Sequence, residues 1–260
     1  MRAYEDGAHG IECDVFLLPK CGTLVVFHGV GSDQDAGRLT GYCCPESTCY
    51  VESGKADDLS IVDLDFTQVQ NLKFDKYGRQ FACPSERIEH ERVPKLEDVL
   101  LLCKERGLHI TVELKGEGTA EPSLKLVEKM DMVDNVTFSS FKHYRIAKIR
   151  ELRPDSYRYK TGALFTILPD NFIDIALNVG ASEVHLRYDS CSKDNVAKVH
   201  SAGMGSMAWF RGYLSMKEDS RIKYLDVGNE DEDMYAIVMS SGVMKMCVNR
   251  PDLLVGMVNK

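Results

Sequence analysis

The chain has 260 residues, 44% of them hydrophobic, and a formal net charge of −8 at pH 7. This length fits one large domain or two small ones, the negative charge argues against nucleic acid as the main partner, and no apolar run reaches the ~20 residues of a membrane span. Nine cysteines, an odd number, favour reduced thiols over a disulfide framework. With no visible secretory signal, we expect a cytoplasmic protein. The sequence leaves its oligomeric state open.

The first predicted element is a β-hairpin. Its two arms are Ile11–Leu18 and Leu24–His28, and the turn Lys20-Cys21-Gly22 between them contains a glycine. The first arm is unusual because Glu12 and Asp14 alternate with its apolar residues. Two carboxylates on one face of such a strand indicate either a chemical role or pairing with positively charged side chains.

After the hairpin, helical and extended patterns alternate along the chain. Together with Ile11–Leu18 they give seven main strands. The further strands are predicted at His109–Lys115, Asn135–Phe141, Tyr157–Phe165, Ser182–Leu186, Ser206–Phe210 and Val243–Val248, and helices at Leu96–Arg106, Glu121–Met130, His143–Leu152, Asp170–Asn178 and Lys193–Ser201. This alternation predicts parallel β-α units. They form either a β/α barrel with one strand unaccounted for or an open doubly wound sheet.

Two polar segments interrupt this alternation, near residues 29–65 and 211–233, and we expect both to be loop insertions. The first contains Cys43, Cys44 and Cys49, whose spacing matches no zinc pattern. The second ends in the acidic run NEDED at 229–233, which we interpret as a solvated helix start.

Three carboxylates form a candidate metal site. Glu12 and Asp14 lie two residues apart on a strand, so they share a face at a distance of roughly 6.6 Å. Glu113 lies near the end of another predicted strand, and such ends converge in a β/α barrel. A hard divalent cation, Mg²⁺ or Ca²⁺, would relieve the repulsion among three carboxylates. The alternative is a solvated strand face on which the acids pair with Lys or Arg.

Two basic residues could complete this site. Lys115 follows Glu113 at a spacing of two residues, so it faces the same side and could contact a phosphate; the alternative is an exposed lysine at a strand end. His28 ends the return arm of the hairpin, which brings it back toward Glu12 and Asp14. A histidine in that position could transfer protons near neutral pH, although a lone histidine is more often structural.

These residues together resemble the glycerophosphodiester phosphodiesterase family, which has an acid-x-acid strand, a short turn and an apolar arm ending in His-Asp. The match continues in order along nearly the whole chain. It consists of Ala8–Val15, Leu24–His28, Arg38–Gly41, Val93–Leu100, Val112–Lys115, Thr137–Phe141, Trp209 and Val248–Leu254. The resemblance implies a single (β/α)8 barrel domain over residues 1–260 that cleaves glycerophosphodiesters, in lipid metabolism, to glycerol 3-phosphate and an alcohol.

The resemblance also implies roles for individual residues. Glu12, Asp14 and Glu113 would bind one divalent cation, Mg²⁺ or Ca²⁺. His28 would be one of two histidines that act as general acid and base, and Lys115 would contact the phosphate. Trp209, also explicable as a core aromatic, would line the side of the site that holds the glycerol or the head group.

The chain departs from the family pattern at its beginning. The family has a first strand ending in His-Arg-Gly and then a Glu-Asn pair, which have no counterpart before Glu12, and Gly29 replaces the aspartate after His28. We therefore expect a barrel whose first strand is missing from this chain. Either longer sequence completes an active enzyme, or the chain is a catalytically impaired relative that binds phosphodiesters or a partner. A third reading is a sphingomyelinase D-like or phosphatidylinositol-specific phospholipase.

Overall fold

The computed structural model describes residues 2–29, 36–39, 59–72, 92–154, 158–210 and 230–259. The chain divides into two compact units. Unit 1 comprises residues 1–12, 103–112 and 131–260, and unit 2 comprises residues 13–102 and 113–130. The boundary crosses the first and third strands, so each of them has residues in both units.

The strands of the described residues form one sheet in the order β2-β1-β3-β4-β5-β6-β7-β8. They are β1 (Gly10–Leu18), β2 (Thr23–Val26), β3 (His109–Leu114), β4 (Val136–Ser140), β5 (Lys160–Phe165), β6 (Glu183–Arg187), β7 (Gly205–Trp209) and β8 (Lys245–Cys247). Apart from β2, this makes the seven predicted strands. They follow one another in chain order, without the reversal that defines a doubly wound sheet, so the barrel alternative is confirmed.

The helices of the described residues alternate with these strands. They are α1 (Arg2–Glu5), α3 (Phe66–Gln70), α5 (Leu96–Arg106), α6 (Ala120–Lys129), α7 (Tyr144–Leu152), α8 (Phe172–Asn178), α9 (Lys193–Ser201), α10 (Glu232–Ser240) and α11 (Pro251–Val258). The five predicted helices are confirmed, α5 and α9 residue for residue. The helix start expected at residues 229–233 corresponds to α10, whereas α3 and α11 were not predicted.

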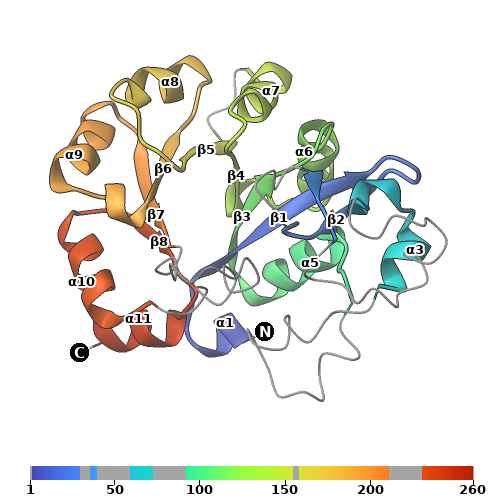
Figure 1. Ribbon diagram of the computed structural model, residues 1–260, viewed down its shortest axis with the longest axis horizontal. Helices are drawn as coiled ribbons and strands as arrows, with labels where there is room; N and C mark the ends of the chain where they lie inside the picture. The colour runs from blue at the N-terminus through green and yellow to red at the C-terminus, as the bar shows by residue number, and fades with distance from the viewer. Residues whose placement is uncertain are drawn as a thin grey trace. The chain divides into compact units, whose positions relative to one another are not determined.

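The α6 helix illustrates why these segments fold as they do. Its buried residues Ala120, Ser123, Leu124 and Val127 recur at helical spacing and form one stripe. Parallel strands of the sheet are buried on both faces, as all five residues of β4 are, which is typical of parallel strands covered by helices. In unit 1, Figure 1 shows α8, α9 and α10 ranged along one side of β6, β7 and β8.

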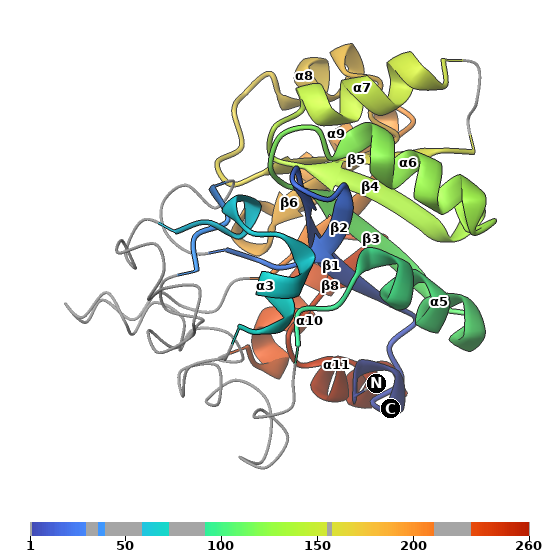
Figure 2. The same ribbon diagram turned by 90° about the vertical axis from the view of Figure 1, so that its right-hand side faces the viewer.

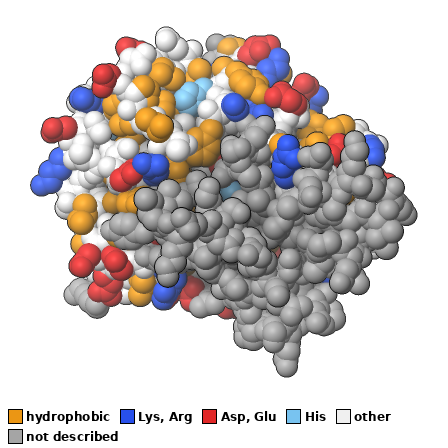
Figure 3. Space-filling model, viewed as in Figure 1, with side chains coloured by type: hydrophobic (Ala, Val, Ile, Leu, Met, Phe, Trp, Pro, Cys, Tyr) orange, Lys and Arg blue, Asp and Glu red, His pale blue; other side chains and the backbone are white. Residues whose placement is uncertain are grey.

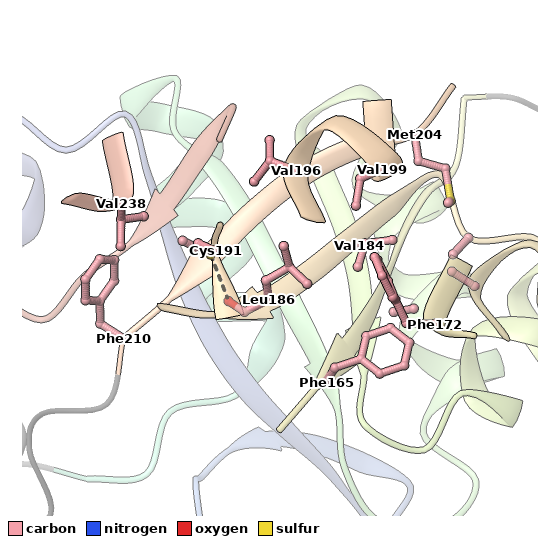
Figure 4. Close-up of a cluster of buried hydrophobic side chains, with 14 of the residues drawn as sticks. Phe165, Phe172, Val184, Leu186, Cys191, Val196, Val199, Met204, Phe210 and Val238 are labelled. Atoms are coloured by element: carbon pink, nitrogen blue, oxygen red, sulfur yellow. Dashed lines mark hydrogen bonds between the residues drawn. The ribbon is translucent and has the colours of Figure 1, made fainter. Parts of the chain in front are cut away.

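The core of unit 1 lies between these helices and the sheet. Figure 4 shows Val184 and Leu186 of β6 pointing into it, together with Phe165, Phe172 and Val199. Because side chains alternate along a strand, the residues between them on β6 point to the opposite face.

The hairpin belongs mainly to unit 2, where it lies between α3 and α5 (Figure 2). Its arms pair antiparallel from Val15 opposite Val26 to Leu18 opposite Thr23. Gly22 closes the turn with a φ of 68°, in the left-handed region that favours glycine, and its N–H donates to the Leu18 carbonyl at 2.8 Å. The predicted hairpin is therefore confirmed, and its apolar residues join a core formed by Phe16, Leu18, Val25, Phe27, Leu39, Ile61, Leu64, Val69, Leu72 and Val93.

The two expected insertions lie largely outside the described residues, as do Cys43, Cys44 and Cys49. At the end of the second, Asp231 caps α10 by accepting a hydrogen bond from the Met234 N–H at 2.8 Å. Our interpretation of the acidic run is wrong for Glu230, which is 3% exposed. Its carboxylate is buried because it accepts hydrogen bonds from the Tyr235 hydroxyl at 2.5 Å and from the Asn249 N–H at 2.8 Å.

Candidate active site

The three predicted carboxylates converge. Glu12 and Asp14 lie on one face of β1, Glu113 lies on the adjacent strand β3, and one carboxylate oxygen from each lies within 4.8 Å of the others. Among the described residues, this is the group of acidic, histidine and cysteine side chains able to hold a metal ion. The predicted clustering is therefore confirmed.

The pairing of β1 with β3 explains this convergence. The Lys115 N–H donates to the Val15 carbonyl at 3.0 Å, so Asp14 is level with the end of β3. On its other edge, β1 pairs with β2 from Val15 onward. Asp14 therefore lies beside the end of β3, where Glu113 lies.

Lys115 is buried in contact with these acids. Its side chain is 1% exposed, and its ammonium nitrogen lies 2.8 Å from Asp14 Oδ1 and 3.8 Å from Glu113 Oε1. The alternative of an exposed lysine at a strand end is wrong. The expected contact with a phosphate stays a prediction.

His28 is tied to the same lysine through its backbone. The Lys115 ammonium donates to the His28 carbonyl oxygen at 3.1 Å, and the Phe27 N–H donates to the Asp14 carbonyl oxygen at 2.9 Å. The return arm therefore brings His28 back to β1, as predicted. The Nδ1 atom of His28 lies 2.8 Å from the carbonyl oxygen of Gly29, an acceptor, which assigns a proton to Nδ1.

Trp209 ends β7 in unit 1 and is half-buried. Its indole N–H donates to the Phe165 carbonyl oxygen at 3.3 Å, and its ring meets Phe141 edge to face at a centroid distance of 5.6 Å. These contacts fix the orientation of the ring. Its predicted role at the glycerol or head-group side stays a prediction.

Sequence reasoning overlooked Arg187, the last residue of β6 and the register partner of Trp209. Its guanidinium donates two hydrogen bonds to the Asp189 carboxylate, at 2.7 and 2.5 Å. Arg187 and Asp189 line a surface cavity of about 390 Å³. They belong to unit 1, where hydrophobic and charged side chains lie side by side near α8 (Figure 3). A charged residue that ends an otherwise buried strand is the signal that could have identified it.

The donor set fits a divalent cation. Carboxylate oxygens are the ligands that Mg²⁺ and Ca²⁺ prefer. Asp14 and Glu113 are only 9% and 8% exposed, so their charges are poorly screened by water. With Glu12 and Lys115, the ionised group carries a formal charge of −2, which one divalent cation would neutralise.

A sheet of parallel β-α units with carboxylates, a lysine and a histidine gathered near the strand ends is the architecture of a β/α-barrel enzyme. The sequence profile of the glycerophosphoryl diester phosphodiesterase family matches residues 1–227. The chain belongs to that family, which confirms the resemblance. Among the described residues, no helix is both long and apolar enough to span a membrane.

Individual relatives are similar to the chain in sequence or in fold. The chain is 26% identical over 264 residues to a glycerophosphodiester phosphodiesterase from Caldanaerobacter subterraneus, with 100% of this chain and 89% of that protein covered. A crystal structure of a candidate glycerophosphodiester phosphodiesterase from Galdieria sulphuraria matches with a TM-score of 0.74 at 21% identity, covering 100% of this chain and 89% of the other. An Oleispira antarctica phosphodiesterase in complex with the product sn-glycerol-3-phosphate matches with a TM-score of 0.72 at 16% identity, covering 98% and 87%.

Proposed function

We propose that the protein hydrolyses glycerophosphodiesters to glycerol 3-phosphate and an alcohol, with one Mg²⁺ or Ca²⁺ ion held by Glu12, Asp14 and Glu113. The observation that carries the proposal is the convergence of these three carboxylates around the buried Lys115. Membership in the phosphodiesterase family supports the reaction class, and the product bound to the Oleispira antarctica enzyme supports glycerol 3-phosphate as the product.

The residues of the site have different proposed roles. When bound, the cation would polarise the phosphoryl oxygens and activate an oxygen nucleophile. Glu12, Asp14 and Glu113 would hold it, and Lys115 keeps the charges of Asp14 and Glu113 close together in a buried setting. Its ammonium group also attracts the negative phosphate, which is its proposed contact with substrate.

His28 is proposed to handle the proton of the leaving alcohol. Because the Nδ1 proton is directed to the Gly29 carbonyl, Nε2 is the nitrogen that exchanges protons. An imidazolium protonated at Nε2 donates that proton to the departing alkoxide oxygen and then returns to the neutral form. Trp209 is proposed to line the glycerol or head-group side with its apolar ring.

The proposal is tested by product analysis. The purified chain is incubated with Mg²⁺ or Ca²⁺ and with the glycerol phosphodiesters of choline, ethanolamine, inositol and glycerol, and released glycerol 3-phosphate is measured enzymatically. We expect release by the wild type, and Glu113→Gln and His28→Asn to lower the rate by about 10²-fold or more. Glu121→Gln, a change at a half-exposed position on α6, is the control and keeps the wild-type rate.

Other outcomes would point to other functions. Tight binding of a glycerophosphodiester without any release of product would indicate a binding role instead of catalysis. Cleavage of sphingomyelin or phosphatidylinositol in vesicles, with no action on glycerophosphodiesters, would indicate a phospholipase.

A further inference from the structure

The interior face of the sheet in unit 1 carries a row of polar and small residues. Register pairs Ser139 of β4 with Gly162 of β5, Gly162 with Glu183 of β6, and Glu183 with Gly205 of β7. Residues paired in a parallel ladder share a face. Since Val184 and Leu186 face the apolar core (Figure 4), Glu183 and His185 face the other way.

The two glycines make room for the larger side chains. A Cβ atom on Gly162 would lie 2.2 Å from Cε1 and Nε2 of His185, so the imidazole ring occupies the space that a side chain at position 162 would fill. A Cβ atom on Gly205 would lie 3.2 Å from Glu183 Cγ. The side chains of Glu183 and His185 therefore fit on this face because Gly162 and Gly205, the register partners of Glu183, lack side chains.

Glu183 fixes which nitrogen of His185 carries a proton. Its carboxylate lies 2.7 Å from the Lys245 ammonium and 3.3 Å from His185 Nε2. Burial raises the pKa of Glu183, but the hydrogen bonds from His185 and Lys245 and the positive charge of Lys245 outweigh burial and lower the pKa to about 2. An ionised carboxylate only accepts hydrogen bonds, so Nε2 of His185 is the donor. In the neutral ring, Nδ1 is then an acceptor.

Two buried polar atoms on this face of the sheet have no hydrogen-bond partner among the described residues. They are His185 Nδ1 and Ser139 Oγ, on side chains that belong to residues 0% and 1% exposed. An unpaired buried polar group costs about 1–3 kcal/mol. The serine hydroxyl can donate and the imidazole nitrogen can accept, yet the two atoms do not bond directly.

We propose that one buried water molecule binds between Ser139 and His185, accepting from the serine hydroxyl and donating to Nδ1 of the histidine. Ser139 is the register partner of Gly162, and the His185 ring lies over that glycine. The two unpaired atoms therefore belong to one face of the sheet, and internal waters typically satisfy such groups. The bound water completes a hydrogen-bond chain from Ser139 through His185 and Glu183 to Lys245. It holds the imidazole ring over Gly162 and does not depend on the proposed function.

A crystal structure at about 1.8 Å resolution tests the site directly. The expected result is density for one water within hydrogen-bond distance of Ser139 Oγ and His185 Nδ1. Nitrogen-15 NMR of the imidazole adds a second readout, with the expected spectrum of a ring protonated at Nε2 alone. A direct bond from Ser139 to His185, dry space at this position or a ring protonated at Nδ1 alone would each overturn the proposal.

Two serine variants give a matched comparison. Ser139→Ala removes one partner of the proposed water and is expected to lower the melting temperature and broaden the His185 NMR signals. Ser123→Ala is the control, because its hydroxyl is also buried without a hydrogen-bond partner among the described residues but lies in α6 of unit 2. Equal changes in both variants would contradict a special role for Ser139.

Discussion

The ammonium nitrogen of Lys115 lies 2.8 Å from Asp14 Oδ1 and donates to the backbone carbonyl of His28 at 3.1 Å. The buried ammonium group of Lys115 therefore contacts both Asp14, a proposed metal ligand, and the backbone of His28, the residue proposed as general acid and base. In the absence of a divalent cation, the same lysine offsets part of the repulsion between Asp14 and Glu113.

Replacing this lysine should therefore destabilise the fold. Lys115→Met keeps the bulk of the side chain but leaves two mostly buried carboxylates without their cation, and we expect a loss of about 3 kcal/mol in the free energy of unfolding. Urea denaturation without divalent cations measures this loss. Saturating Mg²⁺ or Ca²⁺ should restore more stability to the variant than it adds to the wild type.

The matched control is Lys125→Met. Lys125 pairs with Glu121 on the surface of α6, where its side chain is 68% exposed, and exposed pairs contribute about 0–1 kcal/mol. If the two lysine variants lost the same stability, the buried ion pair would not be the source of the effect.

Gly162 is expected to tolerate no side chain. Because its Cβ position lies 2.2 Å from the ring of the fully buried His185, Gly162→Ala forces the ring or the strand to move, at a cost of about 2–3 kcal/mol. Thermal denaturation measures the loss. Gly256→Ala in α11, where a Cβ meets nothing within 4 Å, should instead leave stability unchanged or raise it by up to about 1 kcal/mol. Equal stability of the two variants would contradict this packing.

His109 should make the fold sensitive to acid. Burial, followed by the positive charges of Lys245 and Lys160, lowers the pKa of His109 from 6.5 to about 4. Between these values the unfolded chain binds the proton more readily, so the free energy of unfolding falls as the pH falls from 6.5 to 4. Because the ring is partly exposed, we expect a contribution of about 1–2 kcal/mol.

Urea denaturation at pH 7.5 and pH 4.5 measures this contribution. His109→Gln should lose less stability than the wild type between the two pH values. Thr137→Val removes the hydroxyl that lies 3.0 Å from His109 Nε2 but keeps the imidazole, so it should retain the acid sensitivity. An unchanged pH dependence in His109→Gln would show that other groups cause it.

Replacing Asn249 with aspartate should lower the free energy of unfolding. Its side-chain amide donates to the Glu230 carboxylate, which is buried, so Asn249→Asp sets two acceptors against each other at a cost of about 2 kcal/mol. The loss should shrink as the pH falls below 5, because a protonated carboxyl group can donate. Asn171→Asp, at the exposed start of α8, is the control and should be neutral or slightly stabilising. A loss that did not depend on pH would contradict this explanation.

Local pattern predicted much of the fold and of the candidate site. The convergence of Glu12, Asp14 and Glu113 followed from the two-residue period of strands and the rule that neighbouring parallel strands end together. The bounds of α5 and α9 followed from helical spacing and from the glycines beyond their ends.

Properties that depend on distant partners were not predictable in this way. Lys115 ends its predicted strand, where it could be either a phosphate contact or an exposed lysine, and only its approach to Asp14 shows that it is buried. Glu230 reads as part of a solvated acidic run, but Asn249 and Tyr235, which satisfy its carboxylate, come later in the chain. The space that Gly162 provides for His185 likewise depends on a register that no local pattern reveals.

The most direct test of the central claim is the melting temperature with and without divalent cations. If Glu12, Asp14 and Glu113 together bind the ion, Mg²⁺ or Ca²⁺ at about 100 times its dissociation constant should stabilise the wild type by about 2.7 kcal/mol and raise its melting temperature by several degrees. Glu113→Ala should abolish that rise, whereas Glu121→Ala should preserve it. An equal rise in Glu113→Ala, or none in the wild type, would contradict the metal site on which the proposed hydrolysis rests.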